Sequence, residues 1–321
     1  MENKYRKMRI LTSTLQDGGH LSHSSELSFV TTYYDVYTFK LNNDILDVNK
    51  VEERILELIE MNKKPDVLLI GFSSYSRQID YSVFRDLCDK YDLIYMVDMA
   101  HVAGLVAGGV HPSPIPYADV VTSTVQKTLR SGRGGLILSN NEELGKKIDK
   151  AIFPRLQGGP LMNMIAGKAI GFAEALRPEF KKYQEQVLEN IQGMVKVFND
   201  SHIKMISGGS DNHLLLLDLR EEPFSGADLE KVLEKIGIIV NKNAVQNDPK
   251  PKMETSGVRI GTAAITTRGA GIIDANDIAL IICKTIHHLR NHGGIPDEFF
   301  DEAKDWVKTW CKNHPIYPSY D

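Results

Sequence analysis

Three side chains able to do chemistry follow two short apolar runs between residues 94 and 121. Asp98 and His101 come after the run Ile94–Val97, and Lys127 comes after Val120–Val121. Short apolar runs bounded by glycine and proline are typical of strands buried on both faces of a parallel sheet. Because ligands bind at the carboxyl ends of such strands, we expect a carboxylate, an imidazole and an amine to converge at one edge of the sheet.

This set of groups suits an enzyme that uses pyridoxal phosphate. That cofactor needs a lysine amine for its Schiff base, and a carboxylate that keeps its ring nitrogen protonated so that the ring can withdraw electrons. An aspartate and a lysine after two strands are weak support by themselves, because surface ion pairs are commoner. The segments around them decide the interpretation.

Those segments resemble the serine hydroxymethyltransferase family. VDMAHVAGLVAGGVHPSP at 97–114 and TSTVQKTLRSGRGG at 122–135 are similar to a D-x-A-H segment and a T-x-x-x-H-K-T-L-x-G-x-R-G-G segment that the family has at this separation. The similarity continues, in the family's order, through FPRLQGGPLMNMIAGKAIGFAEAL, SGGSDNHLLLLDL, NKNAVQNDPK and TSGVRIGTAAITTRG. It covers most of residues 18–285.

The resemblance implies an α/β fold, that of the fold-type I, aspartate aminotransferase-like transferases that depend on pyridoxal phosphate. The implied activity is reversible transfer of a hydroxymethyl (one-carbon) unit between serine and glycine, with tetrahydrofolate as carrier, by a dimer or tetramer. We expect a large cofactor-binding domain over residues 1–177 and a small C-terminal α/β domain over 178–321. The boundary is placed before Pro178, because a residue that precedes proline avoids the helical region.

The resemblance also implies roles for single residues at the cofactor. Lys127 would form the Schiff base, and Asp98 would pair with the ring nitrogen. Thr124, which lies shortly before the lysine, can hydrogen-bond the amine. His20, in the matching segment Gly18–His23, would stack on the ring and hold its plane. Further cofactor contacts are implied for His101, Ser73 and Gln126, and for Gly158 and Gly159, which would reach toward the phosphate of a partner's cofactor.

Substrate contacts follow from the same resemblance. Arg259 would bind the substrate carboxylate, since a guanidinium meets a carboxylate with two parallel hydrogen bonds. Folate would contact Gly19, Leu21 and Asn243. Plainer alternatives remain for several of these positions: Ser73 as a helix cap, Arg259 as a surface ion pair, and Asn243 as a turn residue.

Three departures from the family affect these expectations. The family's long N-terminal segment, which supplies a cradle for the cofactor phosphate and folate contacts, has no counterpart, and the large domain is expected to be incomplete at its N-terminus. Gln126 replaces a histidine before the lysine and cannot carry charge. Arg155-Leu156 replace a Gly-Gly pair before Gln157.

Two hypotheses therefore stand. In the first, the chain is an enzyme subunit whose front segment comes from another chain or is absent from the gene model. In the second, it is a catalytically inactive pseudoenzyme that uses the fold to bind a full-length subunit or another protein. We expect the isolated chain to bind the cofactor weakly and to self-associate or need a partner. A related aldolase or aminotransferase is disfavoured by Asn243 and by Gly18–His23.

Composition excludes several other classes of protein. The chain has 38 basic and 42 acidic residues for a net charge of −4, and it lacks a basic tract that would indicate nucleic acid. It has neither an apolar run long enough for a membrane helix nor a signal peptide. Its three widely spaced cysteines predict reduced thiols, a cytoplasmic location and no metal site.

Apolar periodicity gives the expected elements. We predict helices at 48–61, 81–91, 141–152, 162–176, 180–198, 226–236 and 274–289. We predict strands at 8–13, 66–71, 94–97, 120–121, 135–139, 204–206, 213–218 and 238–240.

Overall fold

The computed structural model describes residues 6–317, so the extreme ends of both predicted domains, 1–5 and 318–321, lie outside the described residues. The described chain divides into two compact units. The first comprises residues 6–73 and 78–181, and the second comprises 74–77 and 182–317. The predicted boundary at 177/178 lies shortly before the division at 181/182.

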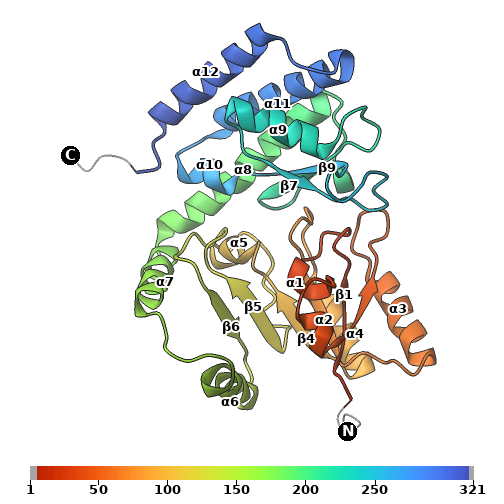
Figure 1. Cartoon of the computed structure of the whole chain (residues 1–321). Helices are drawn as coiled ribbons and strands as arrows, with labels where there is room; N and C mark the ends of the chain where they lie inside the picture. The colour runs from red at the N-terminus through yellow and green to blue at the C-terminus, as the bar shows by residue number, and fades with distance from the viewer. Residues whose placement is uncertain (1–5, 318–321) are drawn as a thin grey trace. The chain divides into compact units, whose positions relative to one another are not determined.

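A mixed β-sheet forms the centre of the first unit. Its strand order is β2-β1-β3-β4-β5-β6, with β1 to β5 parallel and β6 antiparallel to β5. The strands are β1 (Arg9–Ser13), β2 (Asp35–Phe39), β3 (Val67–Gly71), β4 (Ile94–Asp98), β5 (Val120–Thr124) and β6 (Gly135–Leu138). Figure 1 shows these strands side by side.

The register of the sheet brings three strand ends together. Gly71 on β3 pairs with Asp98 on β4, and Asp98 pairs with Thr122 on β5. The residues that follow these strands therefore share one edge of the sheet. This is the edge at which Asp98, His101 and Lys127 were predicted to converge.

Helices cover the sheet of the first unit. The two amphipathic helices α3 (Val48–Glu60) and α4 (Tyr81–Tyr91) begin at the aspartate caps Asp47 and Asp80, and they bury side chains such as Ile55 against the sheet. The other helical segments are α1 (Leu21–Ser24), α2 (Val30–Tyr33), α5 (Ala103–Ala107), α6 (Glu142–Lys150), the irregular η1 (Ala151–Leu156) and α7 (Met162–Ala175).

The second unit contains an antiparallel sheet of order β7-β9-β8. Its core joins Leu215 and Val258 of the sheet to Phe198, Leu233 and Ile282 of three helices. Its elements are α8 (Pro178–Asp200), which begins in the last residues of the first unit, η2 (Ile206–Gly208), β7 (Leu214–Asp218), α9 (Gly226–Ile236), β8 (Asn241–Asn243), β9 (Gly257–Gly261), α10 (Ala263–Thr267), α11 (Ile272–His292) and α12 (Asp297–Asn313).

Most predicted elements are confirmed, and three are wrong in part. The strand predicted at 204–206 is a single bridge from Met205 to Leu217, because Ser207 turns the chain with a φ of 55°. The strand predicted at 238–240 lies at Asn241–Asn243, an edge position where polar residues are tolerated. The helix predicted at 141–152 ends at Lys150 and continues as η1.

Candidate active site

A small cavity opens where β3, β4 and β5 end, within the first unit. Its volume is about 190 Å³. It is lined by His20, Ser22, His23, Phe72, Ser73, Asp98, Ala100, His101, Thr122, Ser123, Thr124 and Lys127. Pockets for drug-sized ligands measure roughly 300–1,000 Å³. This cavity therefore suits a single small ring better than a dinucleotide.

Asp98 is the anionic group of the cavity. Its Oδ2 accepts a hydrogen bond from Nε2 of His23 at 3.1 Å, and its Oδ1 accepts one from the backbone N–H of Ala100 at 3.0 Å. Burial alone would raise the pKa of Asp98, but His23, the Ala100 amide and the Lys127 amine outweigh burial and lower it. Asp98 is consequently a carboxylate at neutral pH, with lone pairs left for a ligand.

Close packing at Gly71 fixes the Asp98–His23 pair. A Cβ at this position would lie 2.8 Å from Cβ of Asp98 and 3.2 Å from Cε1 of His23. Only glycine fits there without displacing one of the two side chains. His23 itself is buried, and its Nδ1 has no hydrogen-bond partner among the described residues.

His20 presents a neutral ring to the same cavity. It caps α1, where its Nδ1 accepts a hydrogen bond from the backbone N–H of Ser22 at 3.2 Å. Burial, followed by the nearby His23 and Lys127, lowers the pKa of His20. The His20 ring centroid lies 5.5 Å from that of His23.

Lys127 lies in the loop after β5, and a hydroxyl holds this loop in place. Thr128 Oγ1 donates to the backbone carbonyl of His101 at 2.7 Å and accepts the backbone N–H of Gly104 at 3.0 Å. The loop that carries Lys127 is thereby tied to the segment that carries His101. Thr124 Oγ1 is buried at the cavity without a hydrogen-bond partner among the described residues.

Comparison with known proteins agrees with this geometry. A family model described as serine hydroxymethyltransferase matches residues 5–282. The chain belongs to this family. It is similar to the serine hydroxymethyltransferase of Baumannia cicadellinicola, with 44% identity over 311 residues, or 96% of this chain and 72% of the relative. It is also similar to serine hydroxymethyltransferase 1 of Pseudomonas putida, with 46% identity over 311 residues, which are again 96% of this chain and 72% of the relative.

The fold class follows from membership of the serine hydroxymethyltransferase family. The family has the fold-type I architecture of transferases that depend on pyridoxal phosphate. The α/β organisation of both units agrees with that class. Among residues 6–317 there is no helix long and apolar enough to cross a membrane.

Most of the residues predicted to contact the cofactor lie in the cavity. These are Lys127, Asp98, His20, His101, Ser73 and Thr124. Three others, Gln126, Gly158 and Gly159, lie outside its lining. Gln126 accepts the backbone N–H of Gly134 at 3.4 Å, and Gly158 and Gly159 are exposed between η1 and α7. The exposed Arg155 and Leu156 precede them in η1.

The residues predicted to bind substrate lie in two places. Gly19 and Leu21 flank His20 in the first unit, and Gly19 packs tightly against Ser13. Arg259 and Asn243 belong to the second unit. There, the guanidinium of Arg259 on β9 donates to Oδ1 of Asn241 at 3.0 Å, and burial lowers the pKa of Arg259.

His23 is the site residue that sequence reasoning missed. It is the last residue of the segment Gly18–His23, in which roles were predicted for Gly19, His20 and Leu21 but not for His23. The spacing of three residues was the available signal, because residues i and i+3 share one face of a helical turn. Asp98 ends β4, which β3 separates from β1 in the sheet, so the pairing of His23 with Asp98 follows only from the fold.

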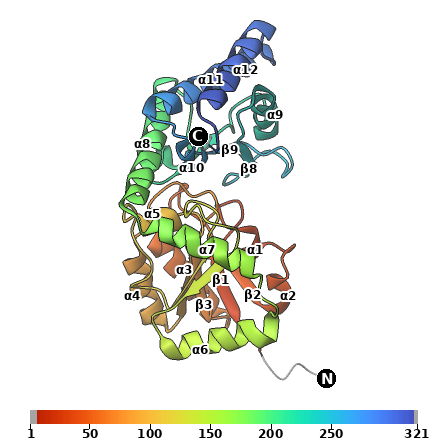
Figure 2. The same cartoon turned by 90° about the vertical axis from the view of Figure 1, so that its left-hand side faces the viewer.

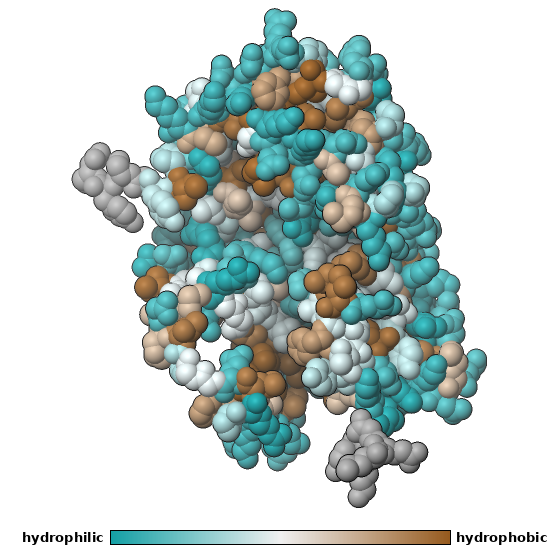
Figure 3. All heavy atoms as spheres, viewed as in Figure 1, coloured by the Kyte–Doolittle hydropathy of each residue, from teal (hydrophilic) through white to brown (hydrophobic). Residues whose placement is uncertain are grey.

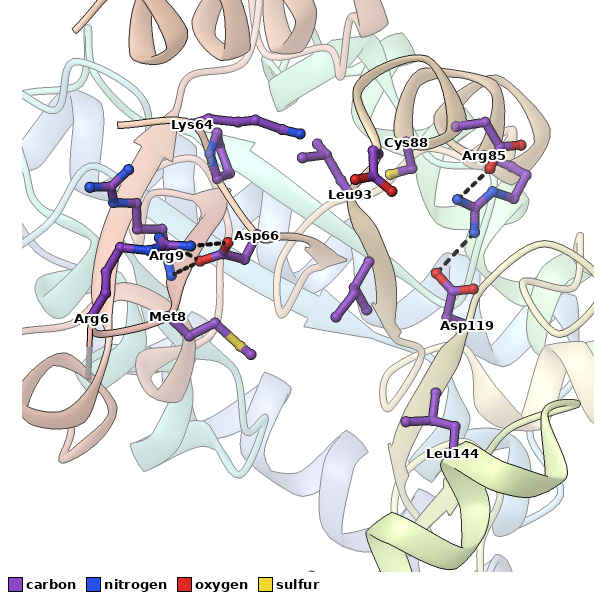
Figure 4. A pocket seen from close by; sticks show the side chains of 14 residues that line it. Arg6, Met8, Arg9, Lys64, Asp66, Arg85, Cys88, Leu93, Asp119 and Leu144 are labelled. Atoms are coloured by element: carbon purple, nitrogen blue, oxygen red, sulfur yellow. Dashed lines mark hydrogen bonds and ion pairs between the residues drawn. The ribbon is translucent and has the colours of Figure 1, made fainter. Parts of the chain in front are cut away.

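A larger cavity lies at the opposite edge of the first unit's sheet. It has a volume of about 1010 Å³, and its basic side chains are matched by acidic ones. Figure 4 shows Arg6 paired with Asp66, and Arg85 with Asp119. Because these charges neutralise each other, the cavity offers no excess charge to a ligand.

Proposed function

We propose that the chain is a subunit of a serine hydroxymethyltransferase that binds pyridoxal 5'-phosphate and interconverts serine and glycine, with tetrahydrofolate as one-carbon carrier. The observation that supports this most directly is the Asp98–His23 pair in one cavity with Lys127. The names and similarity of the relatives support the substrate class.

The cavity fits the ring of the cofactor. The carboxylate of Asp98 is suited to hold a proton on the ring nitrogen, and the Lys127 amine to attach the cofactor covalently. The buried hydroxyl of Thr124 offers a hydrogen-bonding partner to a polar ring substituent or to the amine. When bound, pyridoxal phosphate supplies an electron sink for bonds at the substrate's α-carbon.

The chain's own residues would bind and orient the reactants. His20 presents a flat, neutral ring that can stack on the cofactor, with His101 and Ser73 lining the same cavity. Arg259 would bind the carboxylate shared by serine and glycine. Asn243, together with Gly19 and Leu21, would contact the folate.

The phosphate of the cofactor needs further groups. Among the described residues that line the cavity, Lys127 is the only lysine, and none is an arginine. A phosphate carries nearly two negative charges and is usually bound by several charge-assisted hydrogen bonds, each worth about 1.5–3 kcal/mol. The 321-residue chain by itself should therefore bind the cofactor weakly and turn over slowly.

Additional binding groups would come from an assembly. Gly158 and Gly159 would approach the phosphate of a second subunit in a dimer or tetramer, or another chain would supply an N-terminal segment. An inactive pseudoenzyme that acts as a partner of a full-length subunit would also have few cationic side chains in this lining.

A cytoplasmic location is supported by three free cysteines, Cys88, Cys283 and Cys311.

Cofactor titration and a serine-to-glycine assay on the purified chain test this function. We expect saturable but weak binding of pyridoxal phosphate by absorbance, and turnover far below that of the full-length Pseudomonas putida relative. Binding only at non-specific lysines would contradict the enzyme and favour the pseudoenzyme. Tight stoichiometric binding with full turnover would contradict the expected weakness.

Arg259→Lys tests the substrate site in the same assay. The variant should raise the KM for serine more than it lowers kcat, because a lysine cannot form the two parallel hydrogen bonds. Arg290→Lys, which alters an exposed ion pair with Glu222, is the matched control. An equal effect of the two substitutions would exclude a binding role for Arg259.

A further inference from the structure

A further cavity of the first unit lies where the helices α3 and α4 begin. Its volume is about 310 Å³, which falls within the range of roughly 300–1,000 Å³ for pockets that hold small ligands. The described residues that line it all differ from those that line the cavity at Asp98 and Lys127. The roles assigned at the cofactor and at the substrate therefore leave this cavity unused.

The walls of this cavity are held in place within the first unit. Asn42 and Ile45 exchange two backbone hydrogen bonds, of 2.8 and 3.0 Å, which close a tight hairpin over Asn43 and Asp44. Both turn residues have positive φ angles, of 48° and 64°, as a two-residue hairpin turn requires. The helix α3 contacts α4, and Figure 2 shows both helices on one side of the sheet. The cavity is therefore already formed in the unliganded chain.

Most of the lining is apolar. Six apolar side chains contribute to it: Ile45, Leu46, Val48, Ile79, Val83 and Phe84. Of these, Val83 is half-buried in the first turn of α4, and Ile45 is 39% exposed. A hydrocarbon group that entered the cavity would remove this surface from water, which is favourable. The lining thus suits the apolar body of a ligand.

Two carboxylates line the same cavity. Asp47 caps α3 and accepts the backbone N–H of Asn49 at 2.9 Å. Asp80 caps α4 and accepts the backbone N–H of Ser82, also at 2.9 Å. A hydrogen bond from the Asn42 side chain lowers the pKa of Asp47, and one from the Ser82 side chain lowers the pKa of Asp80. Both groups are therefore ionised at neutral pH, and none of the described residues in the lining is basic.

The charge balance of this cavity favours a single positive charge. Each carboxylate carries one negative charge, and the N-terminus of each helix offsets about half of it. A net charge of about −1 therefore remains. The nearest basic side chains of α3 are engaged in other pairs, Lys50 with Glu53 and Arg54 with Glu57. A monovalent cation is consequently attracted, and an anion is repelled.

We propose that this cavity binds a small organic monocation, an amine with an apolar body. The body lies among the six apolar side chains, and the ammonium group lies near Asp47 and Asp80. A divalent metal ion is a poorer occupant, because it needs several oxygen ligands. Among residues 6–317, no three histidine, cysteine, aspartate or glutamate side chains are placed to hold a metal ion.

Calorimetric titration with three probes tests the proposal. The probes are phenethylamine, phenethyl alcohol and hydrocinnamate, which share an apolar body and differ in the charge of the head group. At pH 7 and low salt the amine should bind best and the carboxylate worst, and added salt should weaken the amine but not the alcohol. The chain is titrated without pyridoxal phosphate, since an amine reacts with its aldehyde. Hydrogen exchange should slow at 42–48 and 78–84 when the amine binds.

Four variants locate the two parts of the ligand. Asp47→Asn and Asp80→Asn remove the charges, while asparagine keeps both helix caps. Each should weaken the amine by about two- to fivefold, and together they should abolish its preference over the alcohol. Asp149→Asn makes the same change on α6, whose surface Figure 3 shows to be hydrophilic, and should leave the preference unchanged. Val83→Phe fills the cavity and should weaken the amine and the alcohol alike.

Several results would overturn the proposal. These are equal binding of the amine and the alcohol, a preference for the amine that survives in the double variant, an equal loss in Asp149→Asn, and no binding of any probe. Slower exchange at 98–104 in place of 42–48 and 78–84 would show that the amine lies at Asp98, and would also overturn it. These measurements need neither cofactor nor turnover, so their outcome is independent of the proposed function.

Discussion

Nε2 of His23 lies 3.1 Å from Oδ2 of Asp98, and this contact joins the first helix after β1 to the end of β4. The two residues are 75 positions apart in the chain. Because His23 is buried, the bond orients the carboxylate and helps to keep it ionised against the cost of burial. We therefore assign His23 as a positioning residue that acts through Asp98.

Replacing His23 should weaken the cofactor site through Asp98. His23→Gln should lower affinity for pyridoxal phosphate about tenfold, because a hydrogen bond to a charged group is worth about 1.5–3 kcal/mol. The measurement is an absorbance titration at several pH values. In the variant, affinity should begin to fall at a higher pH, since Asp98 would take up a proton more readily.

A double-mutant cycle separates positioning from general damage. If His23 acts through Asp98, His23→Gln should have little further effect in an Asp98→Asn background. His292→Gln, at an exposed position in the second unit, controls for the loss of one imidazole. Additive effects of the two site substitutions would show that His23 acts independently of Asp98.

Lys127 should be the lysine that holds the cofactor covalently. Borohydride reduction at saturating pyridoxal phosphate, followed by peptide mapping, should place the label on the peptide that contains Lys127. Lys127→Ala should abolish this label. Lys168→Ala, which removes an exposed amine near Gly135, should keep it. A label that persists at full yield in Lys127→Ala would exclude this assignment.

Gly71→Ala should damage the site without a change of charge. The added Cβ would meet Asp98 at 2.8 Å, so the Asp98–His23 pair must shift. We expect loss of stability of about 1–3 kcal/mol and weaker cofactor binding. Gly145→Ala is the control, because no atom lies within 4 Å of its added Cβ, and it should stabilise α6 by about 0.5–1 kcal/mol.

Urea unfolding and cofactor titration measure the two glycine variants. If Gly71→Ala and Gly145→Ala change the free energy of unfolding and the cofactor affinity equally, then Gly71 is not closely packed against Asp98 and His23. A loss of stability in Gly71→Ala with unchanged cofactor affinity would show that the packing does not reach the carboxylate.

The spacing of apolar residues predicted best those elements that bury one face and expose the other. The helix Tyr81–Tyr91 was predicted to the residue, because its apolar positions face the sheet at helical spacing. The polar strand Asn241–Asn243 was missed, since its pairing depends on the neighbouring β9 and not on its own residues. The pairing of His23 with Asp98 was missed for a similar reason. It arises from the sheet, which brings distant segments together.

The open edge of β6 could not be predicted from the sequence either. The segment 135–139 was expected to be a strand, but its position at the end of the sheet and its antiparallel direction depend on the order of all the strands. Similarly, the sequence 162–176 predicts a helix but does not say which of its sides are covered.

The stability of the unliganded chain should depend on pH through His20. Burial and nearby positive charge lower its pKa below the unfolded value of about 6.5. A lowered pKa in the folded state contributes stability that is present above the unfolded pKa and is lost as the pH falls through the folded pKa. Replacing His20 with a side chain that does not titrate should reduce this loss.

His20→Asn is the informative variant, because asparagine keeps a cap for α1 and does not titrate. Urea unfolding followed by circular dichroism at pH 7, 6 and 5 should show a smaller loss of stability in the variant than in the wild type. His202→Asn, at an exposed position of the second unit, serves as the reference for removing one histidine. Parallel pH profiles for wild type and His20→Asn would show that the His20 ring takes up its proton as readily in the folded chain as in the unfolded one.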